Sequence, residues 1–213
     1  MSHLKQHKRI SKTAYKMIKP YIKDHNFPRY RYISIFDKIL SPDTIHSFKH
    51  IKGFEKFNHH NTSAHNQGVD KCEKFYGKMQ DISKKKHTSS FTASWFAHYL
   101  VDCLEPAHQF DWKVKGSKKS SLKNLNFHLW LERKTKKIKV NDTSDFDFLN
   151  IEDIRSYIEE TSLLIKNLDI QNLFPSHKEE ILSLYRNVVI PLQVRSVASG
   201  WYSVLKNNEK NRV

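Results

Sequence analysis

Two pairs of histidine and acidic side chains have the spacing of metal ligands. His98 and Asp102 are four residues apart, and so are His128 and Glu132. Residues four apart lie one above the other on one face of a helix, so the members of each pair can reach the same metal ion. His108 follows Asp102 after a proline, where the chain can turn and offer a ligand to a second ion. This spacing suits a metal cluster better than a single ion.

The residue types suit a cluster of zinc ions. Asp102 interrupts an apolar stretch, and a buried carboxylate needs either a cation or an ion pair with His98 to offset its desolvation. Carboxylates mixed with imidazoles suit zinc, without excluding manganese or iron. Clustered divalent ions neutralise phosphate oxygens and lower the pKa of a bound water. The sequence holds no Ser/His/Asp nucleophile pattern, phosphate-binding glycine loop or dinucleotide motif that competes with this interpretation.

The overall composition is that of a basic, helix-rich protein. The 213 residues include 37 Lys and Arg against 22 Asp and Glu, a net charge of +15, which favours polyanionic partners such as nucleic acid or anionic lipid. With only 5 Gly and 6 Pro and 38% hydrophobic residues, collagen-like, low-complexity and wholly disordered classes are excluded. Two cysteines cannot form a disulfide scaffold, and Cys103 points off the face of Asp102, so we expect it in the core.

Helical periodicity covers most of the chain. It predicts helices over 10–22, 30–40, 69–86, 91–105, 125–137, 149–168 and 179–205, the last bent or divided at Pro191. Breaks are expected at Ser41-Pro42-Asp43 and Pro106, a Ser89-Ser90 cap is expected before 91–105, and irregular segments are expected at 57–68, 112–123 and 141–147. We find no repeat, linker or strand signal. The prediction is one all-α domain spanning residues 1–213, with roughly seven to nine helices and with Trp95, Trp130 and Trp201 in its core.

At the histidine and acid pairs, the sequence resembles the bacterial zinc-dependent phospholipase C family, the alpha-toxin-like enzymes, and the related fungal single-strand zinc nucleases. That superfamily builds its zinc cluster on His-x3-Asp-x5-His, followed by His-x3-Glu in the phospholipases or His-x3-Asp in the nucleases. The residues that match here are His98, Asp102 and His108, then His128 and Glu132. Residues 197–202 also resemble the closing helix of the family, whose small residues allow tight packing.

The resemblance implies a set of zinc ligands. One zinc would be held by Asp43, His59 or His60, His98 and Asp102, and a second by His108, His128 and Glu132. Asp43, which follows a proline as in the family, would also orient or deprotonate the attacking water. The neighbouring His46, His50 and His65 are alternatives to the early ligands. The third zinc of the family uses an N-terminal Trp that has no counterpart near Met1, although His7 and Asp102 match its other ligands, so we expect two zinc ions and leave the third open.

These observations favour a metal-dependent phosphodiesterase of the phospholipase C type, which would cleave a phospholipid into diacylglycerol and a phosphorylated headgroup. A single-strand nuclease or nucleotidase using the same site is the alternative enzyme, and the Glu at position 132 favours the lipid substrate. A different class is a non-catalytic, basic helical protein that binds nucleic acid or membranes. No apolar stretch reaches the length of a signal peptide or a membrane span, so the chain as given is expected to be cytoplasmic with at most peripheral membrane contact, although the family is usually secreted.

Overall fold

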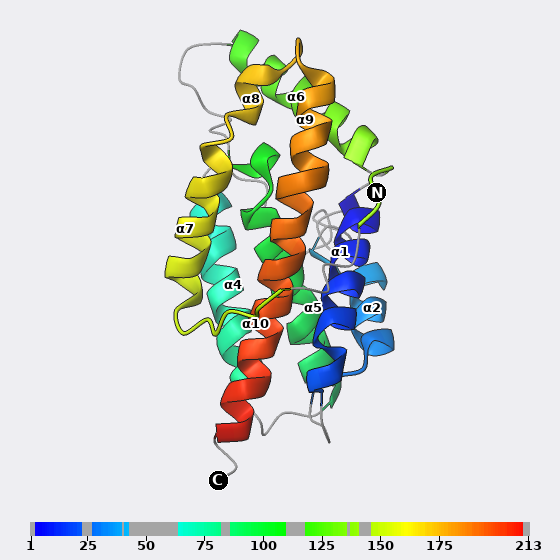
Figure 1. The fold of residues 1–213 in the computed structure, drawn as a ribbon, viewed down its shortest axis with the longest axis vertical. Coiled ribbons are helices and arrows are strands. Elements are labelled where there is room, and N and C mark those ends of the chain that lie inside the picture. Colours follow the sequence, from blue (N-terminus) through cyan, green and yellow to red (C-terminus); the bar gives the residue numbers. More distant parts are fainter. Residues whose placement is uncertain are drawn as a thin grey trace, which may run out of the picture.

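The computed structural model describes residues 3–22, 27–39, 41–42, 64–81, 86–109, 118–135, 137–140 and 146–210. These ranges contain helices and no strand, which confirms the predicted all-α class (Figure 1). The helices are α1 (His3–Ile18), α2 (Tyr30–Ile39), α4 (Ala64–Gln80), α5 (Lys86–Cys103), α6 (Lys118–Thr135), α7 (Ile154–Lys166), α8 (Ile170–Leu173), α9 (Lys178–Leu184) and α10 (Ile190–Lys210). Short 3-10 turns η1 (Lys19–Tyr21) and η3 (Pro106–His108) follow α1 and α5, and a π turn η4 (Tyr185–Val189) separates α9 from α10. None of the described helices is both long and apolar enough to cross a bilayer.

The positions of most helices agree with the prediction, but several boundaries were wrong. Helix α4 begins at Ala64, inside the segment expected to be irregular, and it ends at Gln80 rather than at residue 86. Helix α5 begins at Lys86, so the expected Ser89-Ser90 cap lies within the helix, where Ser89 O accepts a hydrogen bond from Thr92 Oγ1. Helix α6 likewise begins at Lys118, within the expected loop. The first turns of these helices are rich in polar residues such as Lys and Ser. Such residues are compatible with a helix but give no periodic apolar pattern, so periodicity alone does not detect these turns.

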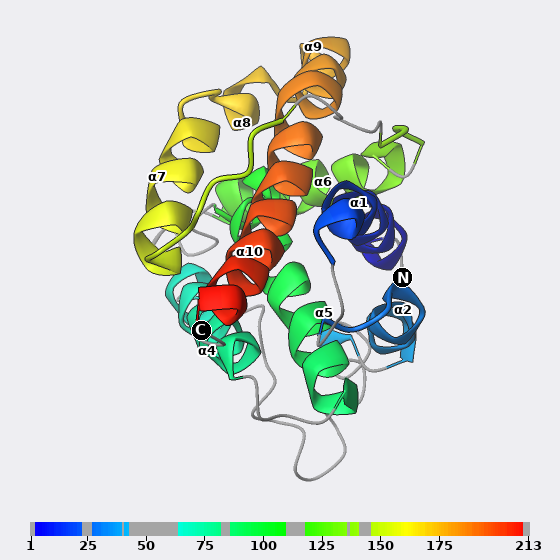
Figure 2. The same cartoon turned by 60° about the horizontal axis from the view of Figure 1, so that its bottom comes forward.

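Helix α5 forms the centre of the molecule. It packs against α4, α2, α10 and α1, which surround it in Figure 2. Every residue from 92 to 101 is buried, because a helix enclosed on all sides has no solvent-facing stripe. Trp95 of this helix and Trp201 of α10 are buried, as predicted, whereas Trp130 is only partly buried. Cys103 is also buried and free, as expected of a core residue.

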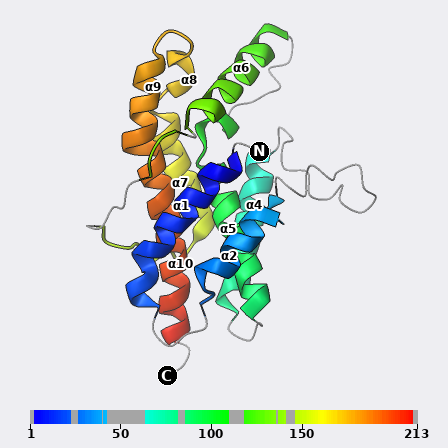
Figure 3. The same ribbon diagram turned by 90° about the vertical axis from the view of Figure 1, so that its right-hand side faces the viewer.

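Helix α10 crosses α5 at very short range because one residue lacks a side chain. A Cβ atom at Gly200 would lie 2.5 Å from Cζ of Phe96 and 2.7 Å from its Cε1. Ala198, Ser199 and Gly200 are all buried, so the tight packing expected of the small residues in segment 197–202 is present. Helix α10 also packs against α1, and the helices α1, α2 and α5 lie next to one another in Figure 3. This packing fixes the first helix relative to the central one.

Helices α9 and α10 follow one another along one rod, with the π turn η4 between them (Figure 1). A bend or division of the 179–205 helix was predicted at Pro191, the second residue of α10; the change in the helix is instead the π turn that ends just before it. Proline has no N–H to donate to the preceding turn, so the hydrogen-bond ladder must change near it. The π turn places Tyr185 toward the interior, where it is fully buried.

Candidate metal centre

A line of polar side chains runs along the buried central helix. Ser90, Ser94, His98 and Asp102 recur every four residues in α5 and therefore share one face. The first three are buried and Asp102 is half-buried. His98 Nε2 lies 3.2 Å from Asp102 Oδ2, so the helical spacing brings the predicted pair into contact.

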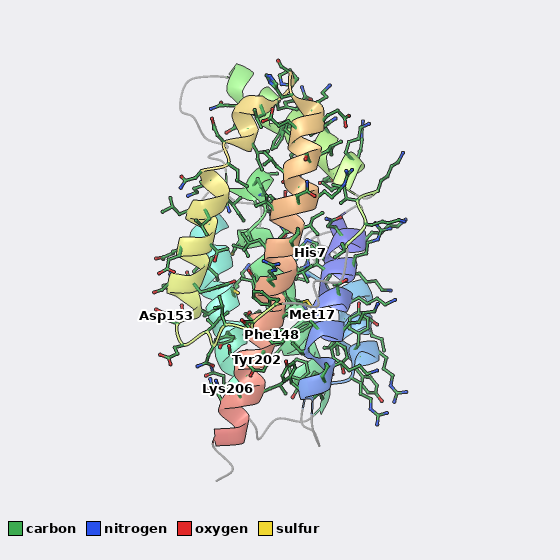
Figure 4. The ribbon with its side chains drawn as sticks, in the orientation of Figure 1. His7, Met17, Phe148, Asp153, Tyr202 and Lys206 are labelled. Carbon is green, nitrogen blue, oxygen red and sulfur yellow. The ribbon has the colours of Figure 1, made fainter. Side chains whose placement is uncertain are left out.

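The first helix adds a second imidazole to this pair. His7 lies toward the N-terminal end of α1, on its inner side (Figure 4). Its Nε2 is 3.2 Å from Asp102 Oδ1, and its ring stacks on that of His98 with 4.2 Å between the centroids. One ligand atom from each of His7, His98 and Asp102 lies within 4.8 Å of the other two. The sequence pointed to His7 only through the family resemblance, because His98 lies 91 positions further along the chain.

The other side of Asp102 meets the second group of predicted ligands. His108, in η3, places Nδ1 at 3.4 Å from Asp102 Oδ1. Its ring stacks on that of His128 in α6, with 5.3 Å between the centroids. His128 Nε2 in turn lies 2.8 Å from Glu132 Oε1. Asp102 therefore lies between two pairs of stacked histidines, His7 with His98 and His108 with His128.

A buried hydrogen-bond cluster holds the chain where it leaves α5 toward His108. Glu105 is buried and accepts hydrogen bonds from the Tyr185 hydroxyl and, at 3.3 Å, from Gln193 Nε2. Gln193 also donates to the Leu104 carbonyl at 3.3 Å. The π turn and the start of α10 thus fix the backbone three residues before His108. Because these hydrogen bonds are buried, they hold this turn in one position.

The charge of Asp102 is strongly favoured in this setting. Burial on its own raises the pKa of the carboxyl, but the attraction of His98, His7 and His108 outweighs burial and holds the pKa well below its usual range. The carboxylate is therefore the anionic partner shared by the three imidazoles. The same attraction would be available to a cation bound between them.

We expect the substitution Asp102→Asn to destabilise the metal-free protein in a pH-dependent way. The pKa of Asp102 is depressed in the folded state, so its stabilising contribution is fully present above the ordinary value of about 3.9 and is lost as the pH falls through the folded value. In the presence of chelator, the urea midpoint of the variant should lie below that of the wild type between about pH 5 and 7, and the difference should shrink below about pH 4. The exposed Asp147→Asn is the control. A difference that grows toward acid pH would contradict this assignment.

The donor set fits zinc. Ligand atoms bound at about 2.0–2.1 Å from a tetrahedral ion lie about 3.3 Å from one another. The two contacts of 3.2 Å from His98 and His7 to the oxygens of Asp102 have this separation. Nitrogen and oxygen donors are also the ligands that zinc takes in hydrolytic sites. His108, His128 and Glu132 offer the same donor types on the other side of Asp102.

The remaining predicted ligands lie outside the described residues. These are Asp43, His59 and His60, together with the side chains of the alternatives His46, His50 and His65. Of the predicted set, the structure therefore brings together one residue from α1, two from α5, one from η3 and two from α6. These residues are His7, His98, Asp102, His108, His128 and Glu132.

A second buried carboxylate, which was not predicted from the sequence, lies next to this cluster. Asp37 of α2 is buried and accepts hydrogen bonds from Ser94 Oγ at 2.6 Å and from Ser11 Oγ at 3.0 Å. Two signals in the sequence could have suggested it. Ser94 precedes His98 by one helical turn, and Asp37 follows the buried Ile33 by four residues on the inner face of α2.

No family model matches this chain, and no curated protein or solved structure matches it either. The geometry of the cluster therefore carries the functional argument. Its central feature is Asp102, which meets imidazoles from α1, α5 and η3.

Proposed function

We propose that this protein is a zinc-dependent phosphodiesterase resembling zinc-dependent phospholipase C, with the fold of that family and a phospholipid headgroup phosphodiester as its substrate. One observation carries the proposal: the half-buried carboxylate of Asp102 is in contact with three imidazoles from three separate elements. A purely structural ion pair needs one histidine, whereas a metal site needs several donors around one point. The stacked His108 and His128 extend this donor set toward Glu132.

The residues of the chain have distinct roles in this proposal. Zinc bound here would supply a Lewis acid for the phosphate oxygens and a water of lowered pKa. Asp102 presents one oxygen to His98 and the other to His7 and His108, so it can hold ligands of two sites at a fixed separation. His128 and Glu132 would complete the second site. The expected role of Asp43 is to orient or deprotonate the attacking water.

A cationic surface on α1 supports an anionic substrate. The outward positions of α1 and η1 carry six exposed basic side chains: Lys5, Lys8, Arg9, Lys12, Lys16 and Lys19. The described residues 3–22 contain no acidic residue, and nitrogen-tipped side chains project outward from α1 and α2 (Figure 4). This α1 basic face can attract anionic headgroups, and it equally fits the phosphates of a single strand. The same face therefore supports a nuclease or nucleotidase as the second candidate function.

We expect binding to anionic surfaces to be strongly salt-dependent and to need the α1 basic face. Exposed charges are screened over about 8–10 Å at physiological ionic strength, so affinity for phosphatidylglycerol vesicles or single-stranded DNA should fall by at least about tenfold between low and high salt. Reversing Lys8, Lys12 and Lys16 to Glu should remove most of this binding. The matched control reverses Lys166, Lys178 and Lys206, which are exposed on α7, α9 and α10. Equal losses in both variants, or no salt dependence, would show that this face does not recruit the substrate.

The proposed activity is tested first by zinc content. Elemental analysis of protein purified without a histidine tag should find two or three zinc ions per chain, and hydrolysis of a chromogenic phosphodiester should stop with chelator and return with zinc. Comparing short-chain phosphatidylcholine with single-stranded DNA then separates the phospholipase from the nuclease. If no metal is bound and zinc restores no turnover, the cluster is a structural ion-pair network. The chain would then be a basic binding protein, whose affinity for vesicles or DNA is unaffected by chelator.

A further inference from the structure

The buried carboxylate of Asp37 connects the two helices that carry the first metal ligands. Its Oδ2 accepts a hydrogen bond from Ser11, and its Oδ1 accepts one from Ser94. Ser11 lies four residues after His7 on α1, and Ser94 lies four residues before His98 on α5. Residues four apart share a helix face, so each serine stands one turn from a ligand and on the same side of its helix.

The hydrogen bonds of Asp37 link three helices at one point. Helix α2 packs against α5, and α1 packs against both of them. Both carboxylate oxygens are used, one by a hydroxyl from each neighbouring helix. A shift of α1 along α5 would therefore break one of two short, buried hydrogen bonds. Buried networks of this kind select one arrangement because a partner left unsatisfied is costly.

The charge of Asp37 also matters to the two imidazoles. Burial raises the pKa of this carboxyl above its usual value, and the hydrogen bonds from Ser94 and Ser11 and the attraction of His98 and His7 offset only part of that rise. Both histidines are thus close enough to affect the pKa of Asp37, although its described hydrogen bonds are to Ser11 and Ser94. In its ionised form this carboxylate would favour a cation held by the two imidazoles, as outer carboxylates do in other metal centres.

We propose that Asp37 is a positioning residue of the metal centre: through Ser11 and Ser94 it sets the spacing of α1 and α5 at which His7 and His98 both meet Asp102. This inference rests on the proposed zinc site. It goes beyond that site because Asp37 contributes no ligand atom and belongs to a helix that carries none of the described ligands. Its role is to fix the relative positions of the ligands before the ion binds.

The experiment measures zinc affinity in Asp37→Asn, which keeps the shape of the side chain but removes its charge and one acceptor oxygen. Competition with a chromophoric chelator should show zinc binding at least about tenfold weaker than in the wild type, as found for outer-sphere changes in metal sites. The visible spectrum of the cobalt-loaded protein should also change, because it reports ligand geometry. A general loss of stability would leave that spectrum unchanged.

A second variant tests the same role if Asp37→Asn does not fold. The double variant Ser11→Ala, Ser94→Ala leaves the carboxylate in place and removes only its two donors, and it should also weaken zinc binding. Its matched control is Ser203→Ala, which removes a buried hydroxyl of α10 that accepts from Ile151 N at 2.7 Å, away from the described ligands. This control should bind zinc within about twofold of the wild type.

The outcomes separate the inference from the function on which it rests. A wild-type protein without zinc overturns both. A wild type that binds zinc, together with an Asp37→Asn and a serine double variant that bind it equally well, overturns the role of Asp37 alone. Equal weakening in Ser203→Ala would also overturn it, because the loss would then come from a general loosening of the fold.

Discussion

Replacing His98 with alanine is expected to remove one zinc ion per chain and to lower phosphodiester hydrolysis at least about a hundredfold. His98 contacts Asp102 and stacks on His7, so its loss deprives both neighbours of a partner in the buried interior. The measurement is zinc stoichiometry by elemental analysis, made alongside kcat/KM for the chromogenic phosphodiester. Because His98 is buried, circular dichroism and urea unfolding of the variant must show that it remains folded.

The corresponding change on the other side of Asp102 separates the two proposed sites. His128→Ala should also cost one zinc ion and abolish hydrolysis, while leaving the contacts of His7 and His98 intact. The matched control is His177→Ala, an exposed histidine before α9 whose side chain makes no capping hydrogen bond. Full activity in either ligand variant would remove that histidine from the site. Loss of activity in the control would point to a nonspecific effect of the substitution.

The substitution Gly200→Ala is expected to lower the free energy of unfolding by about 1–3 kcal/mol. The added methyl would lie 2.5 Å from one ring carbon of Phe96, far inside van der Waals contact. Phe96 is fully buried and its ring lies near Tyr76, so it cannot move aside without displacing other core residues. Either α10 must move away from α5 or the ring must adopt a strained conformation. Urea unfolding at neutral pH measures the loss directly.

Gly77 provides the matched control for this prediction. It lies within α4 and is exposed, and beyond the backbone of its own helix no described atom lies within 4 Å of the position that a Cβ would occupy. Gly77→Ala should therefore stabilise the protein by about 0.5–1 kcal/mol, because alanine loses less conformational entropy in a helix than glycine. If Gly200→Ala had the same effect as Gly77→Ala, the close approach of α5 and α10 would be wrong.

The parts of the site that lie within one helix could be predicted from the sequence. The pairs His98 with Asp102 and His128 with Glu132 follow directly from the period of the helix, and the contacts of 3.2 and 2.8 Å agree with it. The core positions of Trp95 and Trp201 could also be predicted, because each lies in a helix with apolar periodicity. Local periodicity is sufficient for such features.

Contacts between helices could not be predicted in this way. Asp37 reaches Ser11 and Ser94 only because α1, α2 and α5 meet, and no local pattern encodes that meeting. The early start of α5 was missed for a related reason. Ser90, a polar residue in this part of the helix, is buried by the fold, so its place depends on tertiary packing.

The packing of α1 against α10 has a consequence for the order in which the protein assembles. The helix that carries His7 cannot take its final place until α10, far along the chain, has been synthesised and has folded. Contacts between distant segments form late, because the intervening chain must first lose its conformational freedom. Uptake of zinc by His7, His98 and Asp102 would therefore mark the completed fold rather than an intermediate. Once free zinc exceeds its Kd, each further tenfold increase in its concentration would add about 1.4 kcal/mol to the free energy of unfolding, because only the folded protein binds the ion.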